Sequence, residues 1–239
     1  MAKRFYRYEH RTTSLREFFI RTVLRRPLAM RRACFSLEGI SLDIRRGESV
    51  AFIGRNGSGK STALRLIAGI YAPSAGELRV TGRIASVIEL GAGFNPELTG
   101  RENVELYGAV MGLKRREVAV HFDAIVDFAD LGDFVDEPVK YYSSGMQARL
   151  AFAVTVAVEP DILLLDEVLA VGDAVFRERC LARLERFRAR GGTLVVVSHD
   201  LQQVRRLCDR AVWLEKGRVR QEGPAAMVTL AYEAEAQEG

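Results

Sequence analysis

A glycine-rich run in the first third of the chain combines one lysine with two hydroxyl residues. Residues 54–62 read GRNGSGKST and fit the pattern GxxxxGK[ST], with a buried strand expected before them and a helix after them. Glycines allow backbone N–H groups to converge on phosphate oxygens, and a helix that starts beside them adds its positive end. We therefore predict a nucleotide phosphate site formed by Gly54, Asn56, Gly57, Ser58, Gly59, Lys60, Ser61 and Thr62.

A second run, ILLLDE, places two acids at the end of an apolar strand. Lys60 is expected to reach the β and γ phosphate oxygens, while Ser61 and Asp166 are expected to hold Mg²⁺. Glu167 would then polarise the attacking water molecule. A structural glycine turn and two helix-capping acids are the plain alternative, but the two motifs together favour a nucleotide hydrolase.

Two serines and a glycine stand directly ahead of a third feature, the apolar run in YSSGMQARLAF. On its own this is a plain helix N-cap. Small residues at a helix start also permit close approach to an anion, and Ser143 has a hydroxyl to donate. The order of the three motifs along the chain favours this second interpretation.

This stretch resembles the LSGGQ signature of the ATP-binding-cassette family. Tyr142 stands for the leucine, Ser144 for a glycine and Met146 for the glutamine, while Ser143 and Gly145 keep their places. The resemblance covers nearly all of residues 37–239. It implies a homodimer in which Ser143, Ser144 and Gly145 contact the ATP bound by the other copy.

The resemblance extends to two further residues and leaves two positions open. Asp173, in VLAVGDAVF, is similar to the family loop that contacts the opposite subunit, and His199, after a predicted strand, is similar to the histidine that contacts the γ-phosphate. The glutamine that the family usually carries before the helical subdomain is absent here. Glu89 is the nearest substitute for it, and its carboxylate would lie near Mg²⁺. For the ring that stacks on adenine, Phe5 aligns best, with Tyr6 and Tyr8 as alternatives.

Three longer segments resemble the ATPase subunits of bacterial polysaccharide exporters, which move capsular polysaccharide, O-antigen or teichoic acid. They are IELGAGFNPELTGRENV, KYYSSGMQARLAF and LLDEVLAVGDAVF. The resemblance implies two transmembrane permease subunits as partners and a peripheral place on the cytoplasmic face of the bacterial inner membrane. Some O-antigen exporters carry a C-terminal carbohydrate-binding domain, and the end of the sequence at Gly239 favours capsule export.

Charge divides the chain into a basic leading segment and an acidic remainder. Residues 1–33 hold ten Lys and Arg against two Glu, a net +8, whereas the rest of the chain has a net charge of −4. Within this segment, Ser14 to Pro27 reads as an amphipathic helix with a capping box at Ser14 and Glu17. It is either a surface helix on its own domain or a basic amphipathic element that lies against a membrane or a membrane protein. In such an exporter it would contact the transmembrane subunit or the anionic end of the lipid-linked polysaccharide. Nucleic acid is not the expected partner.

Predicted strands and helices alternate along the chain from Gly39 onward, which predicts a mainly parallel sheet covered on both faces. The expected fold is an α/β P-loop NTPase (RecA-like) core with an inserted helical subdomain at about residues 95–158 and an antiparallel β edge. Residues 1–36 would form a basic segment with a short first strand, and residues 37–239 the ATPase domain. The three scattered cysteines fit neither a zinc site nor a disulfide frame.

Three rival functions remain in view. A soluble cassette ATPase acting on DNA or ribosomes usually carries long coiled coils or two fused cassettes, and this sequence has neither. An import or drug-export ATPase has the same fold, but ELTGREN and DEVLAVGDA resemble the polysaccharide branch. A P-loop kinase would have no use for the signature helix.

Overall fold

The computed structural model describes residues 1–8, 31–87, 93–157, 159–167 and 173–238. Its main sheet has six strands in the spatial order β4-β5-β6-β3-β7-β8, of which the first five run parallel and the last pair is antiparallel. In chain order they are β3 (Ser49–Ile53), β4 (Ile84–Val87), β5 (Ile162–Asp166), β6 (Thr193–Val197), β7 (Arg210–Glu215) and β8 (Arg218–Pro224). The predicted parallel sheet with an antiparallel edge is confirmed.

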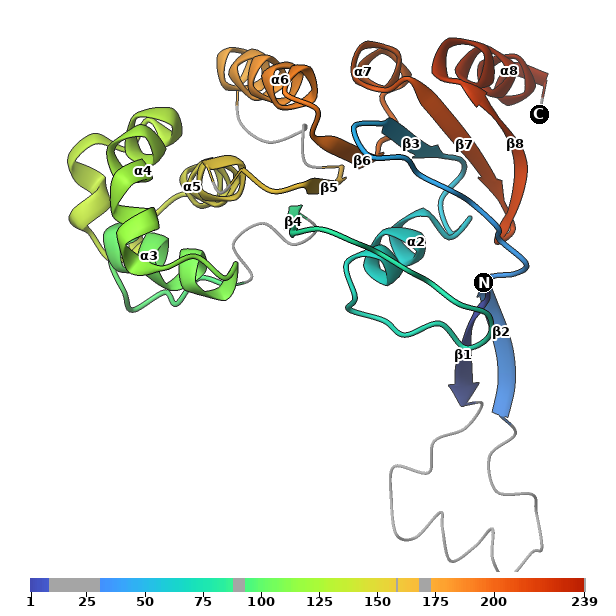
Figure 1. Ribbon diagram of the computed structural model, residues 1–239, viewed down its shortest axis with the longest axis horizontal. Coiled ribbons are helices and arrows are strands. Elements are labelled where there is room, and N and C mark those ends of the chain that lie inside the picture. The colour runs from blue at the N-terminus through green and yellow to red at the C-terminus, as the bar shows by residue number, and fades with distance from the viewer. Residues whose placement is uncertain (9–30, 88–92, 158, 168–172, 239) are drawn as a thin grey trace, which may run out of the picture.

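Both faces of this sheet are buried, because successive side chains of its central strands enter two different cores. In β3, Val50 and Phe52 pack on one side, against α2 (Lys60–Ile67), and Ala51 and Ile53 pack on the other. That second side is covered by α6 (Ala174–Ala189), α7 (Leu201–Leu207) and α8 (Ala225–Glu238), which lie in a row in Figure 1. The continuous apolar composition of the central strands β3 and β6 therefore follows from their double coverage.

A separate block of helices lies at one end of the sheet, beyond β4 (Figure 1). It consists of α3 (Gly100–Val110), α4 (Arg115–Ala129), two 3₁₀ turns (Gly132–Asp136 and Val139–Tyr141) and α5 (Ser144–Ala157). The block has its own apolar core, to which α5 contributes Leu150 and Val154. The same helix sends Phe152 into the core of the main sheet, so α5 joins the two parts mechanically.

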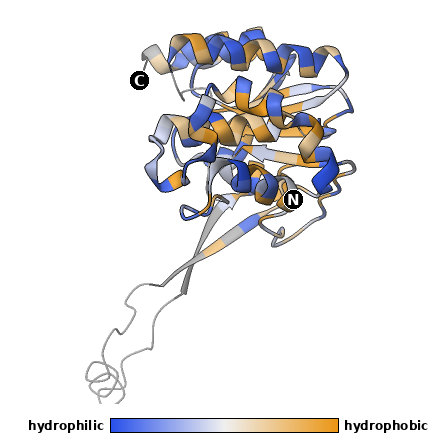
Figure 2. Cartoon of the chain, turned by 90° about the vertical axis from the view of Figure 1, so that its left-hand side faces the viewer, coloured by the Kyte–Doolittle hydropathy of each residue, from blue (hydrophilic) through white to orange (hydrophobic). Residues whose placement is uncertain are grey.

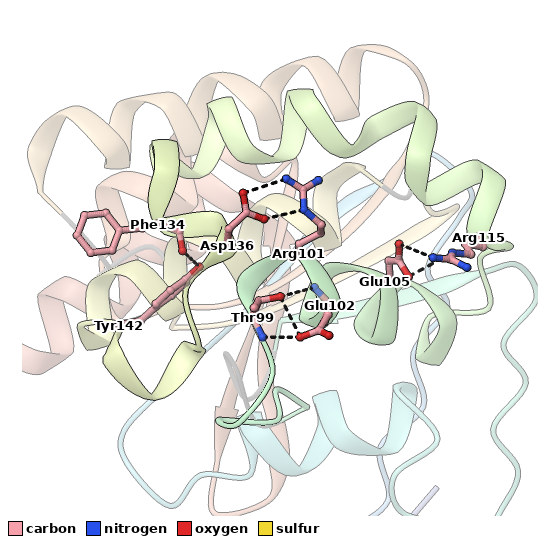
Figure 3. Close-up of polar contacts among 8 residues, drawn as sticks. All are labelled: Thr99, Arg101, Glu102, Glu105, Arg115, Phe134, Asp136 and Tyr142. Atoms are coloured by element: carbon pink, nitrogen blue, oxygen red, sulfur yellow. Dashed lines mark hydrogen bonds and ion pairs between the residues drawn. The ribbon is translucent and has the colours of Figure 1, made fainter.

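Polar contacts fix the start of the helical block (Figure 3). Thr99 and Glu102 form a reciprocal capping box at the start of α3, and Arg101 makes a two-pronged contact with Asp136. Asn103 is fully buried, and its amide donates to the carbonyls of Asn95, Leu98 and Thr99 at 2.9–3.0 Å. The segment that resembles polysaccharide exporters in sequence therefore builds the first turn of α3.

The N-terminal part forms a two-stranded antiparallel ladder of β1 (Lys3–Tyr8) and β2 (Arg31–Leu37), which projects from the body of the molecule in Figure 2. Residues 9–30, which include the helix predicted from Ser14 to Pro27, lie outside the described residues. The proposed division at residue 36 therefore stays a prediction. Among the described residues, no helix combines the length and the apolar composition that crossing a bilayer requires.

Candidate nucleotide-binding site

Three neighbouring strands of the sheet carry the predicted chemical groups at their carboxyl ends. In the order β5-β6-β3, β5 ends at Asp166, β6 leads to Ser198 and His199, and β3 leads into the glycine-rich loop of residues 54–59. Because the strands are parallel, these ends meet at one edge of the sheet, where ligands bind in open α/β sheets. The topology thus brings together residues more than a hundred positions apart in the sequence.

The glycine-rich loop packs so closely on its surroundings that two of its glycines admit no side chain. A β-carbon on Gly54 would lie 2.2 Å from the carbonyl oxygen of Leu214, and one on Gly59 would lie 2.5 Å from that of Ser36. Both residues also have left-handed φ angles, of 139° and 107°. Gly57 differs, since a β-carbon there would meet nothing within 4 Å in the part of the chain that the structure describes, although its φ of 79° still favours glycine.

Lys60 begins α2 and folds back into the loop. Its Nζ donates to the carbonyl oxygens of Gly54 at 2.7 Å and Arg55 at 3.1 Å. Burial lowers the pKa of this ammonium group, and the negative charges of Glu167 and Asp166 act in the opposite direction. A partly desolvated cation held by neutral carbonyls fits the binding of an anionic phosphate oxygen.

The hydroxyl of Ser61 donates to Oδ1 of Asp166 over 3.3 Å. Burial raises the pKa of the Asp166 carboxyl, and the hydrogen bond from Ser61 partly offsets that effect. A hydroxyl and a carboxylate are the oxygen ligands that Mg²⁺ takes beside nucleotide phosphates, and a cation there would relieve the cost of burying the acid. The donor pair therefore fits Mg²⁺, while Glu89, the third predicted contributor, lies outside the described residues.

Glu167 and His199, which follow β5 and β6, approach each other. Oε1 of Glu167 lies 3.6 Å from Nδ1 of His199, and their side chains are 48% and 74% exposed. The backbone of Glu167 is left-handed, with φ 54°, and its N–H donates to the carbonyl oxygen of Val197 at 2.9 Å. An anchored backbone with an open side chain suits a carboxylate that has to meet water.

The remaining loop residues differ in exposure. Asn56 is exposed, whereas the Ser58 hydroxyl is buried and has no hydrogen-bond partner among the described residues. Thr62 has a contact outside the glycine-rich loop, because its hydroxyl oxygen lies 2.7 Å from that of Ser36, near the end of β2. Sequence reasoning did not include Ser36, since no motif marks it.

The signature-like residues lie at the start of α5. The exposed Ser143 caps this helix, its hydroxyl accepting from the N–H of Met146 at 3.2 Å. Tyr142, which departs from the family leucine, is 6% exposed, and its hydroxyl donates to the carbonyl oxygen of Phe134 at 2.5 Å (Figure 3). The departure therefore serves the helical core and leaves Ser143, Ser144 and Gly145 at the surface.

Two further predicted residues have local contacts. Asp173 caps α6 through a 2.8 Å hydrogen bond from the N–H of Phe176. The ring of Phe5 stands edge-on to Tyr71 at 5.5 Å, beyond the C-terminal end of α2, while the phosphate loop precedes the other end. Tyr6 and Tyr8 are register partners of Ala33 and Arg31 in the hairpin. Which ring meets adenine stays a prediction.

A glycine loop lies between a buried strand and a helix, and the serine in the first turn of that helix is bonded to the aspartate that ends β5. This arrangement defines a P-loop nucleotide hydrolase. A family model described as ABC transporter matches residues 37–170. The chain belongs to this family and is one of its ATP-hydrolysing, ATP-binding subunits.

Related proteins agree with this assignment. The O-antigen export system ATP-binding protein RfbB of Klebsiella pneumoniae is 44% identical over 232 residues, which is 97% of this chain and 94% of the relative. The teichoic acids export ATP-binding protein TagH of Listeria monocytogenes serotype 4b (strain F2365) is 39% identical over 234 residues, 98% of this chain and 68% of the relative.

Solved structures agree as well. The structure of an ATP-binding subunit of an ABC transporter is 26% identical, with a TM-score of 0.75, and the match covers 83% of this chain and 88% of that one. A dimeric cassette in a post-hydrolysis state with ADP and phosphate matches with a TM-score of 0.72 over 94% of this chain and 97% of the other, and at 24% identity this likeness concerns the fold.

Proposed function

We propose that the chain hydrolyses ATP to drive the export of a lipid-linked polysaccharide through a membrane permease. The proposal is supported by the 44% identity to a protein named for O-antigen export and the 39% identity to one named for teichoic acid export. In this proposal two copies of the chain act with two transmembrane subunits and lie on the cytoplasmic face of the bacterial inner membrane.

Each ATP would be bound by residues of both copies. Lys60 holds phosphate oxygens, Glu167 orients the water molecule, and His199 contacts the γ-phosphate from the same copy. Ser61 and Asp166 would hold Mg²⁺, which supplies charge neutralisation at the phosphates when it is bound. Ser143 and Gly145 come from the other copy, with Ser144, and Asp173 contributes to the contact between copies.

The surroundings of Gly145 are the observation that best supports an ATP site shared by two copies of the chain, called here the two-copy site. Among the described residues, and apart from the backbone of its own helix, a β-carbon at this position would meet only the Ser143 hydroxyl within 4 Å, at 3.8 Å. The packing of the described residues therefore gives no reason for a glycine in the first turn of α5, although alanine is the better helix former. A ligand or a second chain that approaches the backbone closely would supply that reason.

A cross-linking experiment tests this arrangement. Cysteines are placed at Ser143 and Asn56 in the Glu167→Gln background with Cys34 replaced by serine. The native Cys180 and Cys208 can stay, because burial raises the pKa of both thiols to about 12 and keeps them unreactive. We expect a dimer linked between the two positions only with ATP present.

The matched control places a cysteine at Val120 instead of Ser143. Val120 is 79% exposed on α4 and has no place in the proposed contact. Equal cross-linking by the Ser143 and Val120 variants, or cross-linking without nucleotide, would argue against the two-copy site.

The exported polymer is the finer part of the proposal. Capsular polysaccharide is the predicted substrate, with O-antigen and teichoic acid as alternatives. The match to the O-antigen relative covers 94% of that relative's length, so chain length does not separate capsule from O-antigen. Deleting the chain in its host should remove one surface polysaccharide and trap its lipid-linked form inside, and sugar analysis of that polymer decides between them. An unchanged cell surface would contradict export.

The basic N-terminal segment is proposed to contact the permease or the anionic end of the lipid-linked polymer. We expect glutamine at Arg16, Arg21, Arg25 and Arg26 to reduce export or assembly with the permease while the ATPase activity of the isolated chain is retained. Unchanged export and assembly in this variant would remove the segment from the proposal. Co-purification with nucleic acid instead of a membrane protein would favour the rival acting on DNA or ribosomes.

A further inference from the structure

The turn that joins β7 to β8 supports the phosphate loop from behind. Lys216 and Gly217 form this turn, and both have left-handed φ angles, of 47° and 79°, as two-residue hairpin turns require. The N–H of Gly217 donates to the carbonyl oxygen of Ser58 at 3.0 Å. The carbonyl of Leu214, at the end of β7, is the group that excludes a side chain at Gly54.

The same turn contacts the end of β2. The carbonyl oxygen of Gly217 accepts from the N–H of Glu38 at 2.8 Å. A β-carbon on Gly217 would lie 2.8 Å from the carbonyl oxygen of Ser36, the same carbonyl that excludes a side chain at Gly59. Figure 1 shows the β7–β8 turn beside the segment that follows β2. The phosphate loop, the β7–β8 turn and the end of β2 are therefore joined by direct backbone contacts.

Ser36 adds a side-chain contact to this junction. Its hydroxyl lies 2.7 Å from that of Thr62, in the first turn of α2. Thr62 immediately follows Lys60 and Ser61, so this bond holds the turn that presents the lysine and the proposed metal ligand. In the described structure Ser36 thus contacts both the glycine-rich loop and α2, the helix that follows this loop.

We propose that Gly217 and Ser36 are positioning residues for nucleotide binding. Neither is placed at the nucleotide; they fix the path of the loop backbone, and hence the direction of the N–H groups that would face the phosphates. The inference rests on the proposed assignment of residues 54–62 to phosphate binding. Those N–H groups bind the phosphates equally well in the ground state and in the transition state. A change in their direction therefore raises the KM for ATP more than it lowers kcat.

The test compares Gly217→Ala with Gly191→Ala in the full chain. Gly191 also has a left-handed φ, of 83°, but a β-carbon there would meet no atom of the described residues within 4 Å. Both variants carry the same backbone strain, and only Gly217→Ala must move Ser36. We expect at least about a tenfold rise in KM and in the Kd for a fluorescent ATP analogue with Gly217→Ala, and wild-type values with Gly191→Ala.

Ser36→Ala decides the matter if Gly217→Ala does not fold. It removes one hydrogen bond at a half-buried position, so we expect KM to rise about two- to tenfold, and Ser36→Thr, which keeps the hydroxyl, to restore it. Equal KM for Gly217→Ala and Gly191→Ala, or a wild-type KM for Ser36→Ala, overturns the inference. Lys60→Ala is measured in parallel. If Lys60→Ala also binds the analogue normally, the assignment of residues 54–62 to phosphate binding is wrong. If Lys60→Ala is the one variant that loses binding, the phosphate site stands and the positioning role is overturned.

Discussion

Oε1 of Glu167 lies 3.6 Å from Nδ1 of His199, so the groups that follow two adjacent parallel strands face the same small volume at the edge of the sheet. Both side chains are substantially exposed, and neither is needed for the hydrophobic cores. Changes at these two positions should therefore alter catalysis with little effect on stability.

Replacing Glu167 with glutamine keeps the size of the side chain and removes its negative charge. We expect ATP to bind as before and to be hydrolysed about 100-fold more slowly or worse, because the attacking water loses its base. Phosphate release and binding of a fluorescent nucleotide measure the two effects. His199→Ala serves as a companion, with lower turnover and a melting temperature near that of the unchanged chain. Normal hydrolysis in Glu167→Gln would exclude this residue from catalysis.

Replacing Lys60 with alanine removes the ammonium group that now donates to the carbonyls of Gly54 and Arg55. Charge-assisted hydrogen bonds contribute about 1.5–3 kcal/mol, so we expect a roughly ten- to 150-fold loss of ATP affinity by titration. Lys140→Ala is the control, because Lys140 forms an exposed ion pair with Glu97 in the helical block. Nucleotide affinity that falls equally in both variants would contradict the role of Lys60.

Gly100 and Tyr142 should be energetically coupled. A β-carbon on Gly100 would lie 2.1 Å from the hydroxyl oxygen of Tyr142 and 3.0 Å from the carbonyl oxygen of Val135. We expect Gly100→Ala to lower the free energy of unfolding by about 1–3 kcal/mol through overpacking, and Tyr142→Phe to lower it by about 1 kcal/mol through the lost bond to Phe134.

In the double variant the nearer clash is absent. Its loss in free energy of unfolding should therefore be smaller than the sum of the losses in the two single variants. Chemical denaturation of the four proteins of this cycle measures the coupling. Strictly additive losses would mean that the tyrosine hydroxyl moves aside without cost.

Tyr142 also gives the chain a defined response to alkali. Burial raises its pKa to about 12, from an ordinary value of 10.0. Between these values the unfolded chain has lost the phenolic proton and the folded chain keeps it, so ionisation favours unfolding and stability falls as pH rises from about 10 to about 12. Below pH 10 the contribution is fully present. Tyr142→Phe should show a shallower loss in denaturation curves at pH 9 and 11, and an identical slope in both proteins would refute this explanation.

The sequence was informative wherever a function depends on a short local pattern. The loop of residues 54–59, the acids that end β5, and His199 after β6 all follow from motifs and strand order, and the structure brings them to one edge. The alternation of apolar runs likewise predicted the parallel sheet. Each of these features needs only nearby residues and a regular topology.

Contacts between distant segments could not be predicted in this way. Nothing in the sequence places Gly217 against Ser58, or Ser36 against Thr62, because these pairings depend on how two hairpins and a loop pack together. Tyr142 appeared only as a departure from a motif until its hydroxyl was seen to reach Phe134. Which aromatic ring stacks on adenine depends on the directions of the side chains in β1. The alternation of side chains along a strand does not by itself select one of them.

The register of the N-terminal ladder has a consequence for how this chain can be varied. Tyr8 and Arg31 are partners at its open end, so the polypeptide leaves one strand and rejoins the other across a gap of about 5 Å. A segment spliced between two such closely spaced ends can be joined to both strands without stretching either. The position therefore suits the installation of an epitope by an experimenter, while the catalytic edge of the sheet keeps its geometry.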